Sequence, residues 1–356
     1  MSPNKQKRNI ILYNVIFFFV GCLITYIIMI NYTKTITVKD NTKIYDKTSL
    51  YSSIKKVYDA VVVIESINGD EVTSTGSGFA YKVDSKYAYI ITNEHVLTDF
   101  TIKVTNTENE KVEAEVLGKD PYLDIAIIKV KKEFIKKIVN FGNNDKTNIG
   151  DTIYTIGSPI SINYKGTVTS GIVSGKDRFV QTSVGNNNDN WVMKVIQIDA
   201  PINKGNSGGP LLNVNGDVIG ICSLKFTDEE IEGMGFAIPI EYVKDHIEEL
   251  ENGKAIKWPE IGITTKNIED INNSINNIPE TIKNGIVIVD IKKGEAADKA
   301  KLKKGDVIIS IDDKEIKNIS YFKYELFQHK IGDKIKIEYI RNGNKKTTTL
   351  EINSSK

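Results

Sequence analysis

Gly205-Asn206-Ser207-Gly208-Gly209-Pro210 is the stretch of this 356-residue chain from which the fold and the chemistry are predicted. A serine between glycines, followed by a proline, suits neither a helix nor a strand, so a tight irregular turn is expected. In such a turn the Ser207 hydroxyl points outward while the N–H groups of Gly205 and Ser207 point into one small space. Two converging donors there would bind the negative oxygen that forms when a hydroxyl attacks a carbonyl. A simple glycine-rich hairpin is the alternative, and a base and a carboxylate elsewhere in the chain decide between the two.

The chain has three histidines, and one of them is placed to act as a base. His95 follows the apolar run Tyr87–Thr92, where a loop can project it into a cleft. An imidazole there can take a proton from a serine hydroxyl and return it to a leaving amine. His246 and His329 fall on predicted helices among charged or polar neighbours, which is typical of solvated helix faces.

A base of this kind needs a carboxylate that holds its tautomer, and Asp124 is the predicted one. It begins the apolar run Asp124–Val130 and is therefore expected to be buried, where an aspartate without a hydrogen-bonded partner would be costly. Asp120 is the nearby alternative, but its position between a lysine and Pro121 predicts an exposed turn. The order His95, Asp124, Ser207 is one in which a serine–histidine–aspartate triad occurs along a chain.

The composition is that of an ordinary globular protein with room for two or three domains, 40% hydrophobic and 26% charged. Lys+Arg 47 against Asp+Glu 46 leaves a formal charge of +1, so the charge balance gives no indication of nucleic acid or of a strongly charged substrate. The two cysteines, Cys22 and Cys222, are not expected to form a disulfide, and Cys222 is predicted to be a small core residue. No CxxC or HExxH spacing is present, so no metal site is predicted.

The amino-terminal segment Ile10–Ile30 carries no formal charge, and a helix of about 20 such residues spans roughly 30 Å of hydrocarbon. A cleaved signal peptide is the alternative, but its small-residue exit site is missing from Met29–Lys34. An uncleaved anchor is favoured. Lys5, Lys7 and Arg8 predict a cytoplasmic amino terminus of residues 1–9, a transmembrane helix over 10–30 and a linker over 31–47.

After a short amphipathic helix that begins near Thr48, short β-type runs separated by Gly, Asn and Asp predict two groups of six strands. We therefore expect a mainly β fold with two six-stranded antiparallel barrels and a catalytic cleft between them. The first group is predicted at Ala60–Ile67, Gly78–Val83, Tyr87–Thr92, Ile102–Val104, Val112–Val116 and Asp124–Val130, and the second at Asp151–Gly157, Gly166–Val173, Val192–Asp199, Leu211–Leu212, Val218–Leu224 and Gly235–Pro239.

A helix over Ile240–Leu250 and a change of pattern near residues 252–258 predict a domain boundary. A smaller α+β module follows from Ile261 to Ile352. A polar, Asn-rich insert over Lys266–Asn284 is expected to form a loop. The strands are predicted at Gly285–Ile291, Asp306–Ile311, Lys334–Ile340 and Lys346–Ile352, and the helices at Glu295–Leu302 and Tyr321–Lys330.

Six motifs in a fixed order make residues 50–250 resemble the trypsin-like domain of the HtrA/Deg serine proteases, and Ile261–Ile352 resembles the PDZ domain that follows it in that family. On this resemblance the protease domain covers residues 48–252 and the PDZ domain 258–354. The motifs are Gly76-Ser77-Gly78-Phe79, Thr92-Asn93-x-His95-Val96, Asp124-Ile125-Ala126, Thr169–Ser174, Asp199-Ala200-x-Ile202-Asn203-x-Gly205-Asn206-Ser207-Gly208-Gly209-Pro210 and Gly235–Pro239.

The resemblance implies an ATP-independent serine endopeptidase of protein quality control and stress response, acting on misfolded or exported proteins without a metal or organic cofactor. Ser207 would be the nucleophile, His95 the base and then the acid, and Asp124 the orienting carboxylate, with the amides of Gly205 and Ser207 as the oxyanion hole. The family implies a homotrimer. With the anchor, it implies a single-pass protein of the cell membrane whose protease and PDZ domains lie outside the cytoplasm.

In the PDZ domain, Ile261-Gly262-Ile263 matches the loop that binds a peptide's terminal carboxylate, and the next strand offers an edge for β-augmentation. Phe322 and Leu326 are predicted to wall the pocket for the last side chain, with core packing as the alternative. The chain departs from the family at two positions. Glu260 stands where an aromatic residue is usual, and Lys301 stands where a glycine usually ends the short helix, at a cost of about 1 kcal/mol if the left-handed conformation is kept.

Two other functions are compatible with these motifs. One is a PDZ-dependent binding or holdase protein with an inactive protease-like site, which the presence of all three triad residues disfavours. The other is a regulatory protease that cuts one membrane partner, and it differs from the quality-control enzyme in substrate and not in chemistry. Partners expected on the main hypothesis are unfolded proteins and peptide C-termini, with no nucleic acid.

Overall fold

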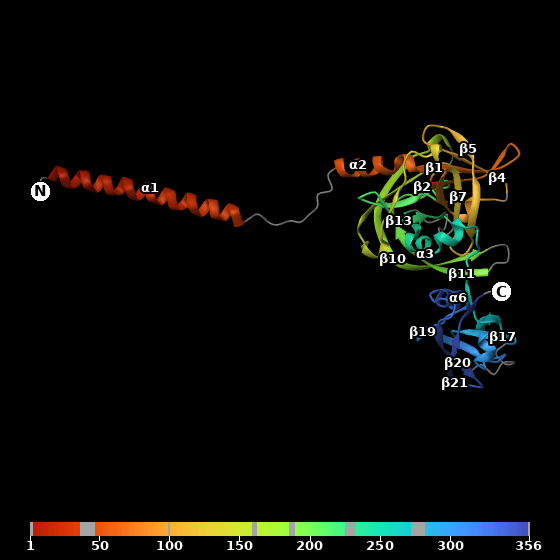
Figure 1. The fold of residues 1–356 in the computed structure, drawn as a ribbon. Helices are drawn as coiled ribbons and strands as arrows, with labels where there is room; N and C mark the ends of the chain where they lie inside the picture. Colours follow the sequence, from red (N-terminus) through yellow and green to blue (C-terminus); the bar gives the residue numbers. More distant parts are fainter. Residues whose placement is uncertain are drawn as a thin grey trace. The chain divides into compact units, whose positions relative to one another are not determined.

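The computed structural model describes residues 3–35, 47–98, 100–158, 162–184, 189–224, 233–271 and 282–354, and the chain divides into two units, Met1–Thr48 and Ser49–Lys356 (Figure 1). The first unit contains the helix α1 (Pro3–Thr35). Between residues 13 and 29 its apolar side chains are exposed, Phe17 to 75%. Within the described ranges, no helix combines the length and the apolarity needed to cross a membrane.

The predicted amphipathic helix forms as α2 (Lys47–Val57), which belongs to the second unit from Ser49 onward. A seven-stranded sheet of order β5-β4-β1-β2-β3-β7-β6 follows it. Every pairing in this sheet is antiparallel. Its strands are β1 (Val61–Asn68), β2 (Glu71–Val83), β3 (Tyr87–Thr92), β4 (Thr101–Thr105), β5 (Lys111–Glu113), β6 (Glu115–Asp120) and β7 (Ile125–Lys131).

The second sheet also has seven strands, in the order β12-β9-β10-β11-β14-β13-β8, and an additional pairing of β12 with β13 closes it into a barrel. The helix α3 (Ile240–Glu251) follows it, close to its predicted bounds. The strands are β8 (Asn140–Phe141), β9 (Thr152–Gly157), β10 (Thr167–Val184), β11 (Asp189–Ile198), β12 (Pro210–Asn213), β13 (Asp217–Cys222) and β14 (Gly235–Pro239).

The prediction of six strands in each group was wrong in both sheets, for two different reasons. The run predicted over Val112–Val116 divides at Ala114, whose N–H donates to the carbonyl of Ile102, so that β5 and β6 are separate strands. The second sheet gains β8, which pairs in parallel with β13 and is too short to show alternation in the sequence. One pairing is therefore parallel where only antiparallel pairings were expected.

Apolar side chains from both sheets form one shared core, which fixes the strand ends nearest the site. Ile91 of β3 and Ile125 and Ile127 of β7 are completely buried in it, together with Tyr154 and Ile156 of β9. Burying one such side chain contributes about 1.5–3 kcal/mol. Because β3 pairs with β7 from Tyr87↔Lys131 to Thr92↔Ala126, the residues that follow β3 and precede β7 lie next to each other.

The smaller module has the predicted order of helices and strands around its own core. Its main sheet runs β16-β17-β18-β20-β21, with β19 paired to β18, and β15 pairs with β22. Part of the Asn-rich insert, residues 272–281, lies outside the described residues. The elements are β15 (Pro259–Glu260), β16 (Ile263–Asn267), β17 (Ile286–Ile291), α5 (Ala296–Lys299), β18 (Val307–Ile311), β19 (Lys314–Glu315), α6 (Ile319–Phe327), β20 (Lys334–Arg341), β21 (Asn344–Glu351) and β22 (Asn353–Ser354).

Single 3-10 turns connect several of these elements, and one of them, η2 (Glu94–Val96), carries the predicted base. The others are η1 (Tyr58–Ala60), η3 (Lys132–Phe134), η4 (Asn144–Lys146), η5 (Ile162–Tyr164) and η7 (Ile268–Asp270). Aromatic contacts join the smaller module to the larger one, since Phe327 of α6 stacks on Trp258 with ring centroids 4.4 Å apart and meets the edge of Tyr122 at 5.7 Å.

Candidate active site

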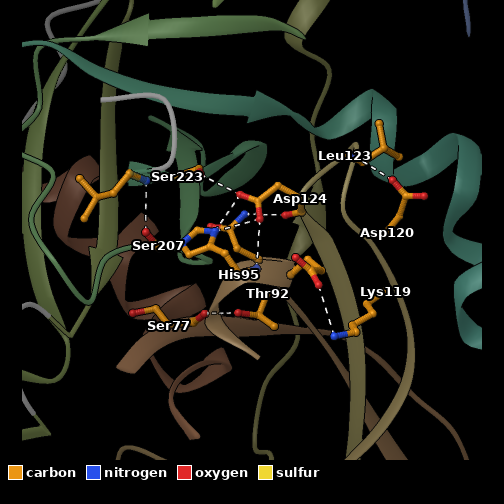
Figure 2. Close-up of polar contacts among 12 residues, drawn as sticks. Ser77, Thr92, His95, Lys119, Asp120, Leu123, Asp124, Ser207 and Ser223 are labelled. Carbon is orange, nitrogen blue, oxygen red and sulfur yellow. Dashed lines mark hydrogen bonds and ion pairs between the residues drawn. The ribbon is translucent and has the colours of Figure 1, made fainter. Parts of the chain in front are cut away.

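His95 and Asp124 are in direct contact, at adjacent ends of β3 and β7 (Figure 2). His95 Nδ1 lies 2.8 Å from Oδ1 and 2.9 Å from Oδ2 of the carboxylate. The His95 backbone N–H also donates to Oδ1, at 3.2 Å. Because an ionised carboxylate only accepts hydrogen bonds, Nδ1 carries the proton in this arrangement, and Nε2 is left as the acceptor. The His95 side chain is about one third exposed, whereas that of Asp124 is 1% exposed.

Asp124 has a left-handed backbone conformation and is held in place by hydrogen bonds from neighbouring side chains. Its φ is +54°, in the left-handed region that a non-glycine residue adopts at a cost. The Ser223 hydroxyl donates to Oδ2 at 2.9 Å, and the Asn93 side-chain amide donates to the Asp124 carbonyl at 2.8 Å. The buried carboxylate is thus hydrogen-bonded on both oxygens, which a buried charge requires.

Asp120 does not occupy the exposed turn that its neighbours predicted, and that prediction was wrong. It ends β6, is 5% exposed, and accepts hydrogen bonds from the Leu123 amide at 2.8 Å and from Trp258 Nε1 at 2.9 Å. Burial raises the pKa of this carboxyl above its usual range. Asp120 therefore supports the loop before Asp124 and makes no contact with His95 among the described residues.

Ser207 lies in a tight turn whose glycines are required by geometry. Gly205 has φ +100° and Gly208 has φ +83°, and a Cβ atom on Gly208 would lie 2.2 Å from the Ser77 carbonyl oxygen. In Figure 2 the His95 ring is seen between Asp124 and Ser207. The Ser207 hydroxyl accepts a hydrogen bond from the Leu224 amide at 3.2 Å, and no hydrogen bond joins it to His95 within the described part of the chain.

The amides of Gly205 and Ser207 make no hydrogen bond within the described ranges. Both residues are buried, where an unpaired N–H costs free energy unless a partner arrives. Two unpaired donors two positions apart in the chain, beside the Ser207 hydroxyl, are the arrangement that stabilises an oxyanion. The structure thus brings His95 and Asp124 together directly and places Ser207 in the predicted turn, with its hydroxyl bonded to Leu224.

His246 of α3 and His329, which lies beyond the end of α6, are half-buried and line a cavity of about 580 Å³ together with Trp258 and Leu123. Cys222 lies against the turn that holds Ser207, since its carbonyl accepts from the Gly208 amide and its amide donates to the Gly209 carbonyl, both at 2.9 Å. Cys222 is buried, as predicted, and burial raises the pKa of its thiol to about 12. No group of His, Cys, Asp or Glu side chains in the described ranges is arranged to hold a metal ion.

The predicted peptide site of the smaller module is only partly open. Ile261 is 2% exposed, and Phe322 and Leu326 are 6% and 3% exposed in the same core, which favours the core-packing alternative for these two side chains. Gly262 has φ +75° and is followed by Ile263 at the start of β16. Glu260 is exposed on β15, opposite Asn353. The carboxylate-binding role of this loop stays a prediction.

Sequence reasoning missed the residues that support the triad. Ser223 was placed inside a predicted strand, and nothing local indicates its bond to Asp124, which lies 99 positions earlier. Asn93 and Ser77 were noted only as parts of motifs. A buried polar residue within an apolar run, as in Ile221-Cys222-Ser223, is the one signal that could have identified Ser223.

Comparisons with known proteins agree with this architecture. Residues 76–221 match the family model of the trypsin-like peptidase domain, and residues 259–352 match that of the PDZ domain. The Serine protease Do-like HtrA of Bacillus subtilis is 37% identical over 292 residues, covering 80% of this chain and 64% of the relative. The Serine protease HtrA-like of Staphylococcus epidermidis is 35% identical over 334 residues, covering 89% of this chain. The chain thus spans only 64% and 56% of the length of these two relatives.

Solved structures of the same type superpose on most of the chain. The serine endoprotease from Yersinia pestis is 27% identical with a TM-score of 0.62, covering 86% of this chain and 98% of that one. The HtrA-type protease AlgW with tripeptide is 28% identical with a TM-score of 0.62, covering 86% and 97%. On its sequence, its two domains and these likenesses, the chain belongs to the HtrA/Deg family of trypsin-like serine proteases with one carboxy-terminal PDZ domain.

Proposed function

We propose that this chain is an ATP-independent serine endopeptidase that hydrolyses peptide bonds of misfolded or exported proteins. The observation that carries the proposal is the bond from His95 Nδ1 to the buried Asp124 carboxylate, next to a turn that holds Ser207 and two unpaired amides. Ser207 is the proposed nucleophile, His95 the base and Asp124 the carboxylate that orients it. No step of this chemistry requires a metal or an organic cofactor.

The proposed reaction begins when the Ser207 hydroxyl donates to His95 Nε2, because a base must be within hydrogen-bond reach of the proton it takes. The Leu224 amide donates to Ser207 Oγ, so this contact leaves the hydroxyl proton free for the base. Ser207 Oγ then attacks the carbonyl carbon of the substrate, and the proton passes to Nε2. The C–O π electrons become an oxyanion that the amides of Gly205 and Ser207 hold, and one such donor contributes about 2.7–4 kcal/mol.

Collapse of this intermediate breaks the peptide bond and leaves an acyl group on Ser207. His95 delivers its proton to the leaving amine, and then activates a water that releases the acyl group by the same steps in reverse order. Asp124 stays ionised throughout and stabilises the imidazolium, for which both of its oxygens are already positioned.

Substrate delivery through the PDZ domain is part of the proposal. The HtrA-type protease AlgW has been solved with a tripeptide and with a decapeptide, and residues 259–352 of this chain match the family model of the PDZ domain. Peptides with a free carboxy-terminal carboxylate should bind here more tightly than the same peptides amidated, as titration of a fluorescent peptide would show. Equal binding of the two forms would contradict carboxylate recognition by Ile261-Gly262-Ile263.

A homotrimer and a single membrane anchor over residues 10–30 complete the proposal. Support for the anchor is the uncharged stretch in the sequence, together with the exposure of its apolar side chains in α1. The anchor predicts that the full chain stays in the membrane pellet after carbonate extraction, whereas a chain that begins at residue 36 is released. Sedimentation of that shorter chain tests the trimer.

Cleavage of casein by the wild-type chain and by the Ser207→Ala variant tests the enzyme function. A comparable deletion of a serine nucleophile lowers kcat by about 10⁶, so the variant should show no cleavage above background. Unchanged cleavage would exclude Ser207 as the nucleophile. The lack of a hydrogen bond between Ser207 and His95 among the described residues is the one observation that favours the holdase alternative. That alternative predicts suppression of aggregation by both proteins and cleavage by neither.

A further inference from the structure

The strand β2 approaches the nucleophile turn closely, because glycines flank the one serine that faces the turn. A Cβ atom on Gly76 would lie 2.5 Å from Val96 Cγ2 and 3.0 Å from the Ser207 carbonyl oxygen. A Cβ atom on Gly78 would lie 2.6 Å from Ile64 Cδ1. A side chain at position 76 would press on Val96 and the turn, and one at position 78 would press on the apolar core behind the strand. The Gly-Ser-Gly sequence therefore brings the backbone of Ser77 into contact with Ser207.

Every polar atom of Ser77 has a partner in or next to the active site. Its N–H donates to the Ser207 carbonyl at 2.8 Å, and its carbonyl accepts from the Thr92 hydroxyl at 2.7 Å (Figure 2). Its hydroxyl accepts from the Ser158 amide at 3.0 Å and donates to the Gly205 carbonyl at 2.6 Å. The side chain is completely buried, so water does not compete for these bonds.

The direction of the bond between the Ser77 hydroxyl and Gly205 follows from the hydrogen-bond donors that are present. A serine hydroxyl has one proton, and the Ser158 N–H already points at its oxygen, so the proton goes to the Gly205 carbonyl. Hydrogen bonds arranged in this order strengthen one another in a buried setting. The hydroxyl therefore holds the carbonyl of the same residue whose amide is one of the two proposed oxyanion donors.

Gly205 needs such a restraint more than other residues would. Its φ of +100° lies in a region that glycine enters and leaves freely. Other hydrogen bonds hold the preceding part of the loop. The Ile172 amide donates to the Asp199 carboxylate at 2.6 Å, and the Thr169 hydroxyl donates to the Pro201 carbonyl at 3.0 Å. Among the described residues, the Ser77 hydroxyl is the side-chain group that fixes the Gly205 end.

From these contacts we propose that Ser77 is a positioning residue for the oxyanion hole, which sets the orientation of Gly205 through its carbonyl. This inference deepens the proposed function and rests on it. The Ser77 hydroxyl does not touch the substrate. It acts by keeping the Gly205 amide aimed at the place where the negative oxygen forms, so its loss weakens the transition state more than the ground state.

The test uses the Ser77→Ala variant of the full chain, with a fluorogenic peptide taken from a casein site that the wild-type chain cuts. The backbone bonds of residue 77 remain, and only the hydroxyl is removed. We expect kcat to fall about 10- to 100-fold with KM changed less than about 3-fold, since loss of a complete oxyanion donor lowers kcat about 10²–10³-fold. A trifluoromethyl ketone of the same peptide, which forms an oxyanion on Ser207, should bind more weakly by the factor that kcat/KM loses.

Ser53→Ala is the matched control, because it also removes a buried hydroxyl that donates to a backbone carbonyl at 2.6 Å, that of Val214. Both variants should lose thermal stability, but only Ser77→Ala should lose kcat and affinity for the ketone. If Ser77→Ala does not fold, Ser77→Cys keeps the packing with a weak S–H donor and should show a smaller loss of the same two quantities.

The outcomes separate the inference from the function on which it rests. A wild-type chain that cleaves neither casein nor the peptide contradicts the proposed function. An active wild-type chain together with a Ser77→Ala variant of unchanged kcat, or of unchanged affinity for the ketone, contradicts the positioning role. In that case the Ser77 hydroxyl contributes to stability only.

Discussion

The Ser223 hydroxyl donates a 2.9 Å hydrogen bond to Oδ2 of Asp124, although the two residues come from different sheets. Ser223 directly follows β13 of the second sheet, and Asp124 directly precedes β7 of the first. The same oxygen lies 2.9 Å from His95 Nδ1. The contact between the Asp124 carboxylate and the proposed base His95 therefore depends on the packing of the two sheets against each other.

Ser223→Ala removes this bond and should lower kcat about 10-fold, because a hydrogen bond to a charged group contributes about 1.5–3 kcal/mol and the carboxylate keeps its other partners. KM should change little, because Ser223 holds the Asp124 carboxylate, and this carboxylate stabilises an imidazolium that forms only during the reaction. Steady-state kinetics on a casein-derived peptide measures both quantities. A raised KM with an unchanged kcat would instead assign Ser223 to substrate binding.

Asp124→Asn and Asp120→Asn should differ sharply, although the two aspartates are four positions apart. Asp124→Asn stabilises the wrong tautomer of His95 and should lower kcat about 10⁴-fold. Asp120→Asn should keep kcat within a few-fold. It should destabilise the fold by about 1–3 kcal/mol, because one amide oxygen replaces the two acceptors used by Leu123 and Trp258. Steady-state kinetics and urea unfolding of both variants measure these changes. An equal loss of kcat in the two variants would contradict the assignment of Asp124 as the carboxylate that orients His95.

Asp84 should make the stability depend on pH below about 4. The Tyr89 hydroxyl and then the amides of Lys86 and Tyr87 donate to its carboxylate and lower its pKa to about 2. A lowered pKa in the folded state means that the contribution is present above the unfolded value and is lost as the pH falls through about 2. The difference in Tm between wild type and Asp84→Asn should therefore shrink between pH 5 and pH 2. A difference that stays constant over this range would contradict the assignment.

Lys301→Gly should stabilise the PDZ domain by about 1 kcal/mol. Lys301 follows α5 with φ +61°, a left-handed conformation that costs a residue with a side chain about 1–2 kcal/mol. The bond from Arg341 to the Lys301 carbonyl uses only backbone at this position and remains. The matched control is Lys299→Gly inside α5, which should destabilise by about 1 kcal/mol. Urea unfolding measures both, and the two changes must have opposite signs.

The sequence alone predicted those parts of the molecule that depend on local pattern. The runs that became β3 and β7 are apolar and β-branched, so their ends, and with them His95 and Asp124, were placed correctly. For Lys301 after α5, a cost was expected only for the case that the left-handed conformation is kept, and the structure keeps it. These features need no information from distant parts of the chain.

What the sequence did not predict depends on partners far along the chain. Asp120 stands next to a lysine and a proline, which indicate exposure, but Trp258 covers it from 138 positions away. The bonds from Ser77 to Gly205 and from Ser223 to Asp124 cross 128 and 99 positions. No pattern along the chain shows which buried hydroxyl meets which carbonyl, so these supports are seen only in the folded molecule.

Covalent labelling with a fluorophosphonate, followed by mass spectrometry of the labelled peptides, tests the central claim most directly. This reagent reacts with a serine only where a base activates it beside oxyanion donors. The proposed site predicts one adduct, on Ser207, which is lost in Ser207→Ala and formed far more slowly in His95→Ala. An adduct on another serine, or labelling of Ser207 at the same rate without His95, would contradict it.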